Sequence, residues 1–228
     1  MPELTSHRAP APRPIAPADG TIRRLLGEAA WGRLNPNVRA RFAVKPAPGR
    51  VLTFVGTMTE VRRSWFGWLL ASACRLIGTP LPPQQGRQVP AIVRIYRAGD
   101  GDGIVWERHY QFGRSRPFTM RSTKRPDGAG GLLECAGYGF AMRLRLFERD
   151  GALHFASIGY CLELGGRRVT LPDLFTPGQA LVTHRDEGGG RFRFTMAMAH
   201  RWFGESFFQD GLFRQVTEGD ATNPNSNS

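Results

Sequence analysis

Residues 50–61 read RVLTFVGTMTEV, and this stretch decides the fold class. Successive side chains of a β-strand point to opposite sides, so a strand shows a period of two residues. One side of the stretch carries β-branched side chains: Val51, Thr53, Val55, Thr57 and Thr59. The other side carries Leu52, Phe54, Gly56 and Met58. The alternation predicts a strand.

Seven further stretches have a similar pattern, at residues 89–97, 103–112, 117–123, 138–151, 152–164, 179–185 and 191–202. Turn sequences separate them: AGDGDG, RDGA, LGGR and DEGGG. This spacing, with few intervening helices, favours antiparallel pairing. About eight such strands are enough to curl round into a barrel. We therefore expect an α+β, β-rich fold with a single large curled antiparallel sheet, as a barrel or half-barrel, and N-terminal helices.

The N-terminal helices are expected before the first strand. Residues 21–34, TIRRLLGEAAWGRL, repeat apolar residues at helical spacing, and Thr21 can cap this helix. Asn35-Pro36 ends it, because the residue before a proline avoids the helical conformation. A short second helix is expected over residues 37–42, NVRARF.

The length of 228 residues suits one domain with tails. Residues 1–20 are rich in proline and alanine, so we expect a flexible tail there. Residues 218–228 are polar, which predicts a disordered tail. No linker or repeat interrupts residues 21–217, which we interpret as a single globular domain.

The formal net charge is +12, and Lys45 and Lys124 are the only lysines, so arginine supplies almost all of the positive charge. A basic surface favours nucleic acid, anionic lipid or acidic ligands. The arginines are spread along the whole chain, which is typical of a solvated surface rather than a dedicated patch. Four arginines alternate with apolar residues as in a stacking platform for single-stranded nucleic acid: Arg143, Arg145, Arg191 and Arg193. A half-exposed sheet also produces this alternation of arginine and apolar residues, so we do not expect nucleic acid as the partner.

Residues 64–78, SWFGWLLASACRLIG, are the most apolar stretch and predict a helix with a narrow polar strip. Three interpretations remain open. A helix packed on or across the sheet is favoured. A lid over an apolar cavity would make Trp65 and Trp68 part of its wall. A membrane-surface anchor is disfavoured, because the polar face carries little charge.

Cysteine usage and the N-terminus bear on location. Cys74, Cys135 and Cys161 have no metal-type spacing, and their odd number favours reduced thiols in a cytoplasmic protein. The first residues contain no apolar signal region, and no apolar run is long enough to span a bilayer. We expect no metal site.

Several motifs resemble a known family. They are IRRLLGEAAWGRLNPNVRARF, VWERHYQFG followed by FTMRST, LLECAGYGFAMRLRL and RRVTLPDL. Together they resemble the bacterial family called domain of unknown function 4166, over most of residues 22–217. The family carries no assigned chemistry, so the resemblance implies no catalytic residues. Some members are similar domains that follow a dinucleotide-binding oxidoreductase domain, which implies a supporting role beside such a partner. No glycine-rich nucleotide-binding pattern follows a strand here, so we expect no cofactor.

The positions that match the family pattern are Trp106, Arg108, Phe112, Gly113, Phe118, Ser122, Glu134, Leu171 and Pro172. Strand alternation puts Trp106, Arg108, Tyr110 and Phe112 on one face. An arginine among aromatic residues is either a salt-bridged core residue or the anion clamp of a pocket. Glu134 is the expected partner of Arg108, because a buried arginine needs one.

Catalytic signatures are scarce in this sequence. Glu107 and His109 share the opposite strand face and would form an acid–base pair if that face lined a cavity. Alternation favours an outward polar face for them. The remaining histidines of the strands stand alone: His154, His184 and His200. Whether the protein is an enzyme is left open.

The leading hypothesis is an accessory module that binds a small, largely apolar ligand in a curled-sheet cavity. Its candidate binding residues are Trp106, Arg108, Tyr110, Phe112, Glu134, Trp65 and Trp68. The alternative is an isomerase-like cavity enzyme using Arg108 and Glu134 or Glu107 and His109. A second alternative is a basic surface for nucleic acid or anionic lipid, with affinity that falls with salt.

Overall fold

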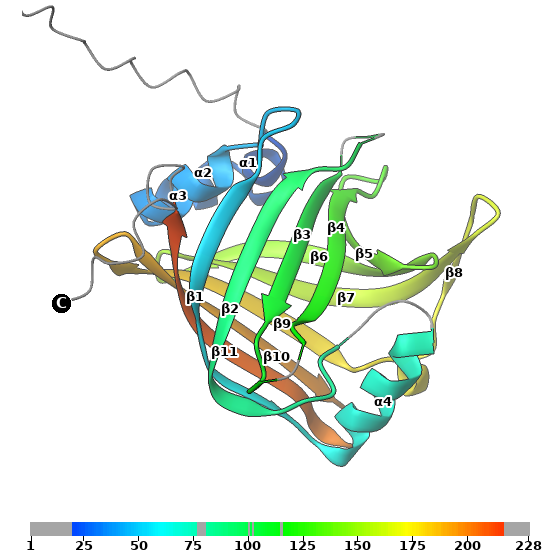
Figure 1. The fold of residues 1–228 in the computed structure, drawn as a ribbon. Helices are drawn as coiled ribbons and strands as arrows, with labels where there is room; N and C mark the ends of the chain where they lie inside the picture. The colour runs from blue at the N-terminus through cyan, green and yellow to red at the C-terminus, as the bar shows by residue number, and fades with distance from the viewer. Residues whose placement is uncertain (1–19, 77–80, 100, 102, 115, 217–228) are drawn as a thin grey trace, which may run out of the picture.

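The computed structural model describes residues 20–76, 81–99, 101, 103–114 and 116–216. The tails expected at residues 1–20 and 218–228 lie outside this part of the chain, apart from Gly20. The described residues form a closed antiparallel barrel with short helices at its two ends (Figure 1).

Ten antiparallel strands close the barrel, in the order β6-β5-β4-β3-β2-β1-β11-β10-β9-β7, and the pairing of β7 with β6 completes the ring. Their bounds are β1 Leu52–Arg63, β2 Gly86–Arg97, β3 Ile104–Tyr110, β4 Phe118–Pro126, β5 Leu132–Gly137, β6 Phe140–Arg149, β7 Ala152–Leu164, β9 Gln179–Gly188, β10 Arg191–His200 and β11 Gly204–Val216. The short strand β8, Arg167–Thr170, pairs with β7 outside the ring. The expectation of a curled antiparallel sheet is confirmed, and the sheet is a barrel rather than a half-barrel.

Strand β7 divides one of its edges between two neighbours. Its first half pairs with β9, ending at Ala156, and its second half pairs with β8, starting at Cys161. In the interval between them, Ser157 Oγ accepts a hydrogen bond from the Ala180 amide, at 2.8 Å. The Tyr160 hydroxyl donates to the Gly178 carbonyl, at 2.6 Å. Side-chain contacts therefore replace the strand ladder over this short part of the wall.

The side chains of β1 alternate as predicted. Phe54 and Met58 point into the core and are 2% and 0% exposed. The register of β1 against β11 shifts between Met58 and Glu60, after which Val61 is buried. A β-bulge of this kind bends a strand, which helps a long strand to follow the curve of a barrel.

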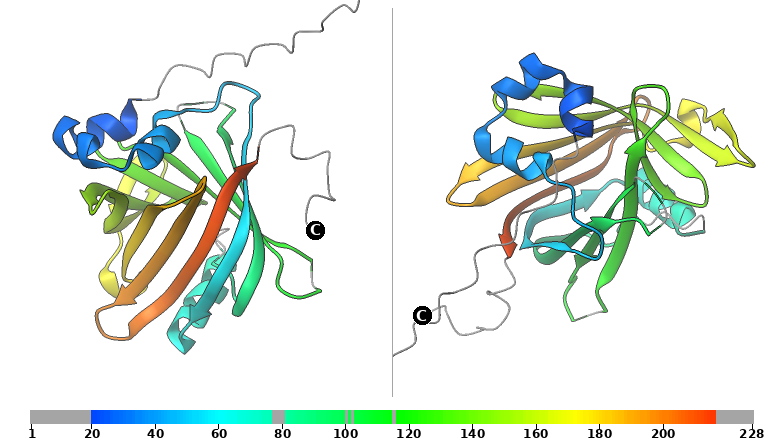
Figure 2. Two further views of the ribbon diagram at one scale, coloured as in Figure 1. Left: turned by 90° about the vertical axis from the view of Figure 1, so that its left-hand side faces the viewer. Right: turned by 90° about the horizontal axis from the view of Figure 1, so that it is seen from above.

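The N-terminal helices lie at the upper end of the barrel (Figure 1, Figure 2). The single helix expected over residues 21–34 is wrong, because α1 (Thr21–Leu26) and α2 (Glu28–Arg33) are separated by Gly27 at φ 82°. Thr21 is the first helical residue rather than the cap, and the N-cap position is Gly20.

Helix α3 (Pro36–Ala43) follows α2 and anchors this end of the chain. The Asn35 side chain caps α3 by accepting from the Asn37 amide, at 2.8 Å. Its inner face buries Val38 and Phe42 in the main core, together with Leu34 just before the helix. The upper end of the barrel is therefore closed by apolar side chains.

Helix α4 (Trp65–Leu76) packs on the opposite end of the barrel, against β11 and β1. Gly67 makes this contact possible, because a Cβ atom there would lie 1.8 Å from the Ser206 carbonyl oxygen. Phe66 and Ala71 are buried, at 6% and 0% exposure. In the described part of the chain, no helix has the length and apolar character needed to cross a membrane.

Candidate ligand-binding site

Three adjoining cavities lie within the barrel. The first has a volume of about 90 Å³, the second about 20 Å³ and the third about 80 Å³. They share walls, because His184 lines the first and second, Trp106 the second and third, and Phe155 the first and third. The first cavity alone exceeds the roughly 10–15 Å³ that one buried water needs.

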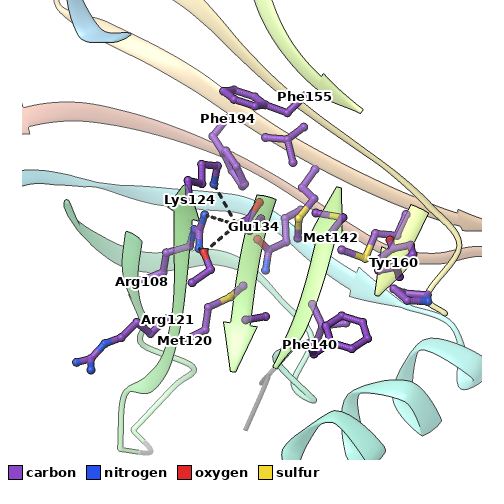
Figure 3. Close-up of a pocket in the computed structure, with 18 of the residues that line it drawn as sticks. Arg108, Met120, Arg121, Lys124, Glu134, Phe140, Met142, Phe155, Tyr160 and Phe194 are labelled. Atoms are coloured by element: carbon purple, nitrogen blue, oxygen red, sulfur yellow. Dashed lines mark hydrogen bonds and ion pairs between the residues drawn. The ribbon is translucent and has the colours of Figure 1, made fainter. Parts of the chain in front are cut away.

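A charged cluster projects into the first cavity (Figure 3). Lys124 Nζ lies 3.0 Å from Glu134 Oε1, and Arg108 Nη2 lies 3.7 Å from the same oxygen. Ser122 bridges the group, since its Oγ accepts from Arg108 at 3.2 Å and donates to Glu134 at 2.7 Å. The predicted pairing of Arg108 with Glu134 is confirmed.

Strand register explains why these side chains meet. Lys124 of β4 is directly opposite Glu134 of β5, and Ser122 of β4 is directly opposite Trp106 of β3. Arg108 follows two residues after Trp106 and so faces the same way. Three neighbouring strands thus present their inward positions to one another.

Electrostatic attraction keeps the Glu134 carboxylate ionised. Burial acts to raise the pKa of Glu134, but the charges of Lys124 and Arg108 and the Ser122 hydrogen bond outweigh it and hold this pKa at about 2. Burial lowers the pKa of Lys124, and the Glu134 carboxylate opposes that shift. Lys124 also lies 4.6 Å from the Trp106 ring centroid, a cation–π contact that stabilises a buried ammonium.

His184 is a cavity residue that the sequence did not single out. It is 4% exposed and lies among aromatic rings, with Phe42 at 5.0 Å and Phe194 at 5.4 Å between centroids. Burial, reinforced by the nearby Arg41 and Lys124 charges, lowers the pKa of His184 well below 6.5. The imidazole is therefore neutral near pH 7, and its buried Nδ1 has no hydrogen-bond partner among the described residues.

Two further polar residues line the cavities and were also missed. Gln209 of β11 is 0% exposed and lines the first cavity, where its Oε1 accepts from the Tyr110 hydroxyl at 3.2 Å. Arg41 of α3 lines the second and third cavities, with its guanidinium 3.7 Å from the Phe192 ring centroid. Burial lowers the pKa of Arg41 to about 10, partly offset by Asp186.

The predicted aromatic residues of β3 separate into two groups. Trp106 and Tyr110 line the cavities, as a face shared with Arg108 requires. Phe112 follows β3 and packs against the main core without lining a cavity.

The structure does not bring Trp65 and Trp68 to the cavities. They are 69% and 49% exposed, on the outer side of α4. Trp65 instead contacts Phe203 at the β10–β11 turn, with centroids 5.8 Å apart. The reason is that α4 packs through Phe66 and Ala71, which turns both tryptophans outward.

Glu107 and His109 lie on the outer face, as alternation favoured. His109 Nε2 is 2.9 Å from Glu107 Oε1, and Arg121 and Tyr96 also hydrogen-bond to this carboxylate. Hydrogen bonding from Arg121 outweighs burial and keeps the pKa of Glu107 below 4.5. None of the three internal cavities is lined by Glu107 or His109.

Two other expectations concern metal ions and arginines. No group of three or more histidine, cysteine, aspartate or glutamate side chains placed to hold a metal ion occurs within the described ranges. Arg143, Arg145 and Arg191 are exposed on the barrel wall, and Arg193 forms ion pairs with Glu187 and Asp210.

Fold and site define a β-barrel domain with a charged cluster inside a largely apolar cavity. A family model described as domain of unknown function (DUF4166) matches residues 34–213. The chain belongs to this family, which confirms the resemblance. No curated protein matches the sequence.

Proposed function

We propose that the barrel binds a small, largely apolar ligand in its interior and acts as an accessory, ligand-holding module. The observation that carries the proposal is the group of adjoining internal cavities, because protein interiors are ordinarily close-packed and large voids are rare. Binding sites for small molecules are typically apolar, with a few polar groups that fix orientation. The Arg108–Glu134 cluster supplies such groups.

The wall of the first cavity suits an irregular apolar guest. Four of the six methionines line it: Met120, Met142, Met196 and Met198. Methionine side chains are flexible and polarizable, so they adapt to different shapes. A wall of this kind allows the cavity to enlarge when a ligand enters.

Native mass spectrometry of the purified protein, compared with its denatured mass, tests the proposal. We expect an added mass that is lost on denaturation. A protein carrying no such mass, and showing no rise in unfolding temperature with 1-octanol, would contradict it. A cavity-filling variant sharpens the test: Val182→Phe replaces an isopropyl group by a larger aromatic ring in the first cavity and should abolish the added mass.

The matched control is Val169→Phe. Val169 lies on β8, is 54% exposed and lines none of the three cavities. This variant should keep the added mass. Retention of the mass in both variants would show that the molecule is bound elsewhere.

A further inference from the structure

Three positively charged side chains inside the barrel lie where the cavities meet. Arg108 lines the first and second cavities, Lys124 the first and third, and Arg41 the second and third. Each pair of adjoining cavities therefore shares one buried positive charge. Such charges are costly to bury unless each is paired.

Carboxylates do not balance these cations. Glu134 is the only carboxylate among the described residues that line the three cavities. It serves both Lys124 and Arg108, while Asp186, outside the linings, interacts electrostatically with Arg41. Within the described part of the chain, two carboxylates thus face these three cations, which leaves an excess positive charge where the cavities meet.

The other cations at the cavity walls do not alter this charge balance. Arg121, Arg125 and Lys45 also line the cavities. The partners of Arg121 and Arg125 are Glu107 and Glu163 at the outer wall, and Lys45 has an interaction of its own. Figure 3 shows the Arg121 side chain pointing away from Glu134.

Two buried donors at the cavity walls meet no acceptor among the described residues. They are Gln209 Nε2, on the first cavity, and Arg41 Nη1, on the second and third. A buried N–H group without a partner costs about 1–3 kcal/mol. An anionic oxygen in the cavities would supply both the missing acceptor and the missing charge.

We propose, resting on the proposed function, that the ligand is an anionic amphiphile whose carboxylate binds at Arg108, where the first two cavities meet. Its apolar body lies against the methionine wall of the first cavity. A carboxylate fits because it accepts charge-assisted hydrogen bonds from a guanidinium and neutralises one excess charge. Glu134 then orients Arg108 rather than neutralising it fully.

Calorimetric titration of the full chain with octanoate and with 1-octanol separates the two proposals. The two probes share a chain and differ in charge. We expect octanoate to bind with a dissociation constant at least about tenfold lower. Equal affinities for the two probes would contradict the proposal of an anionic head group but not the proposal of an apolar binding site. Binding of neither probe would overturn both proposals.

Variants locate the head group. Arg108→Met should weaken octanoate about tenfold and change 1-octanol by less than about threefold. The control Arg167→Met, on the exposed strand β8, should leave both affinities unchanged. Octanoate affinity that is preserved in Arg108→Met and lost in Arg167→Met would place the anion on the surface and overturn the inference. Should Arg108→Met not fold, the comparison of the two probes on the unaltered chain still decides.

Discussion

Lys124 and Glu134 face each other directly across β4 and β5, with Nζ and Oε1 3.0 Å apart inside the barrel. Their side chains are only 12% and 13% exposed. A pair so placed contributes little net stability as a pair, but the loss of one member leaves an uncompensated buried charge.

Glu134→Ala should destabilise the fold strongly, by about 3–5 kcal/mol, because Lys124 and Arg108 would lose their shared carboxylate. Urea unfolding measures the change. The control is Glu205→Ala, which removes the exposed partner of Arg62 and should cost less than about 1 kcal/mol. Similar losses in the two variants would contradict the buried cluster.

The free energy of unfolding at acid pH should depend on the same carboxylate, Glu134. The pKa of Glu134 is about 2 in the folded protein and 4.5 ordinarily, so the unfolded chain binds the proton first. The resulting stabilisation, about 3 kcal/mol, is fully present above pH 4.5 and is lost as the pH falls toward 2. Unfolding free energies measured across this window should fall less steeply in Glu134→Gln. An unchanged slope in that variant would show that other groups carry the acid sensitivity.

His184 should make stability depend on pH in a different window. Its folded pKa lies well below 6.5, so protonation favours the unfolded chain. Stability should fall as the pH drops below 6.5, by up to about 1.4 kcal/mol per pH unit. His184→Phe keeps an aromatic ring among Phe42 and Phe194 and should flatten that decline. A His109→Phe control, on the outer face, should leave the decline in place.

Gly67→Ala should destabilise the packing of α4, because the new methyl group would overlap the Ser206 carbonyl oxygen. Thermal unfolding should show a clear drop in melting temperature. Gly32→Ala is the matched control: it lies in α2 with no atom within 4 Å of the new Cβ, and alanine is the better helix former. It should raise stability slightly, by about 0.5–1 kcal/mol. Equal effects would mean that α4 is not held in this position.

The sequence predicted the strands whose side chains alternate, and it missed those whose side chains do not. Strand β5 reads LLECAG and buries two successive leucines, while β8 reads RRVT and is exposed throughout. Strand β11 buries Phe207 and Gln209 but has Phe208 and the pair Asp210-Gly211 between apolar positions, which hides its period. Barrel closure depends on which distant strands pair, and local pattern carries no such information.

The candidate site was predictable only in part, for a related reason. Arg108 stood out because a charge between Trp106 and Tyr110 needs a partner. Gln209 and His184 are polar residues within strands, and the neighbouring sequence does not show that their side chains point inward. Arg41 lies on a helix whose position over the barrel is set by tertiary packing.

The divided edge of β7 bears on how a ligand of the proposed site would enter and leave the barrel. Tyr160 lines both the first internal cavity and a hollow on the outer wall between β7 and β9. At this point the barrel wall is a side chain rather than a strand ladder. Tyr160 is 5% exposed and its hydroxyl donates to the Gly178 carbonyl, so any movement of the ring must break this hydrogen bond. A ligand of the proposed site that passed here would need Tyr160 to swing aside while every strand of the ring stays paired, so its uptake and release would not require the barrel to unfold.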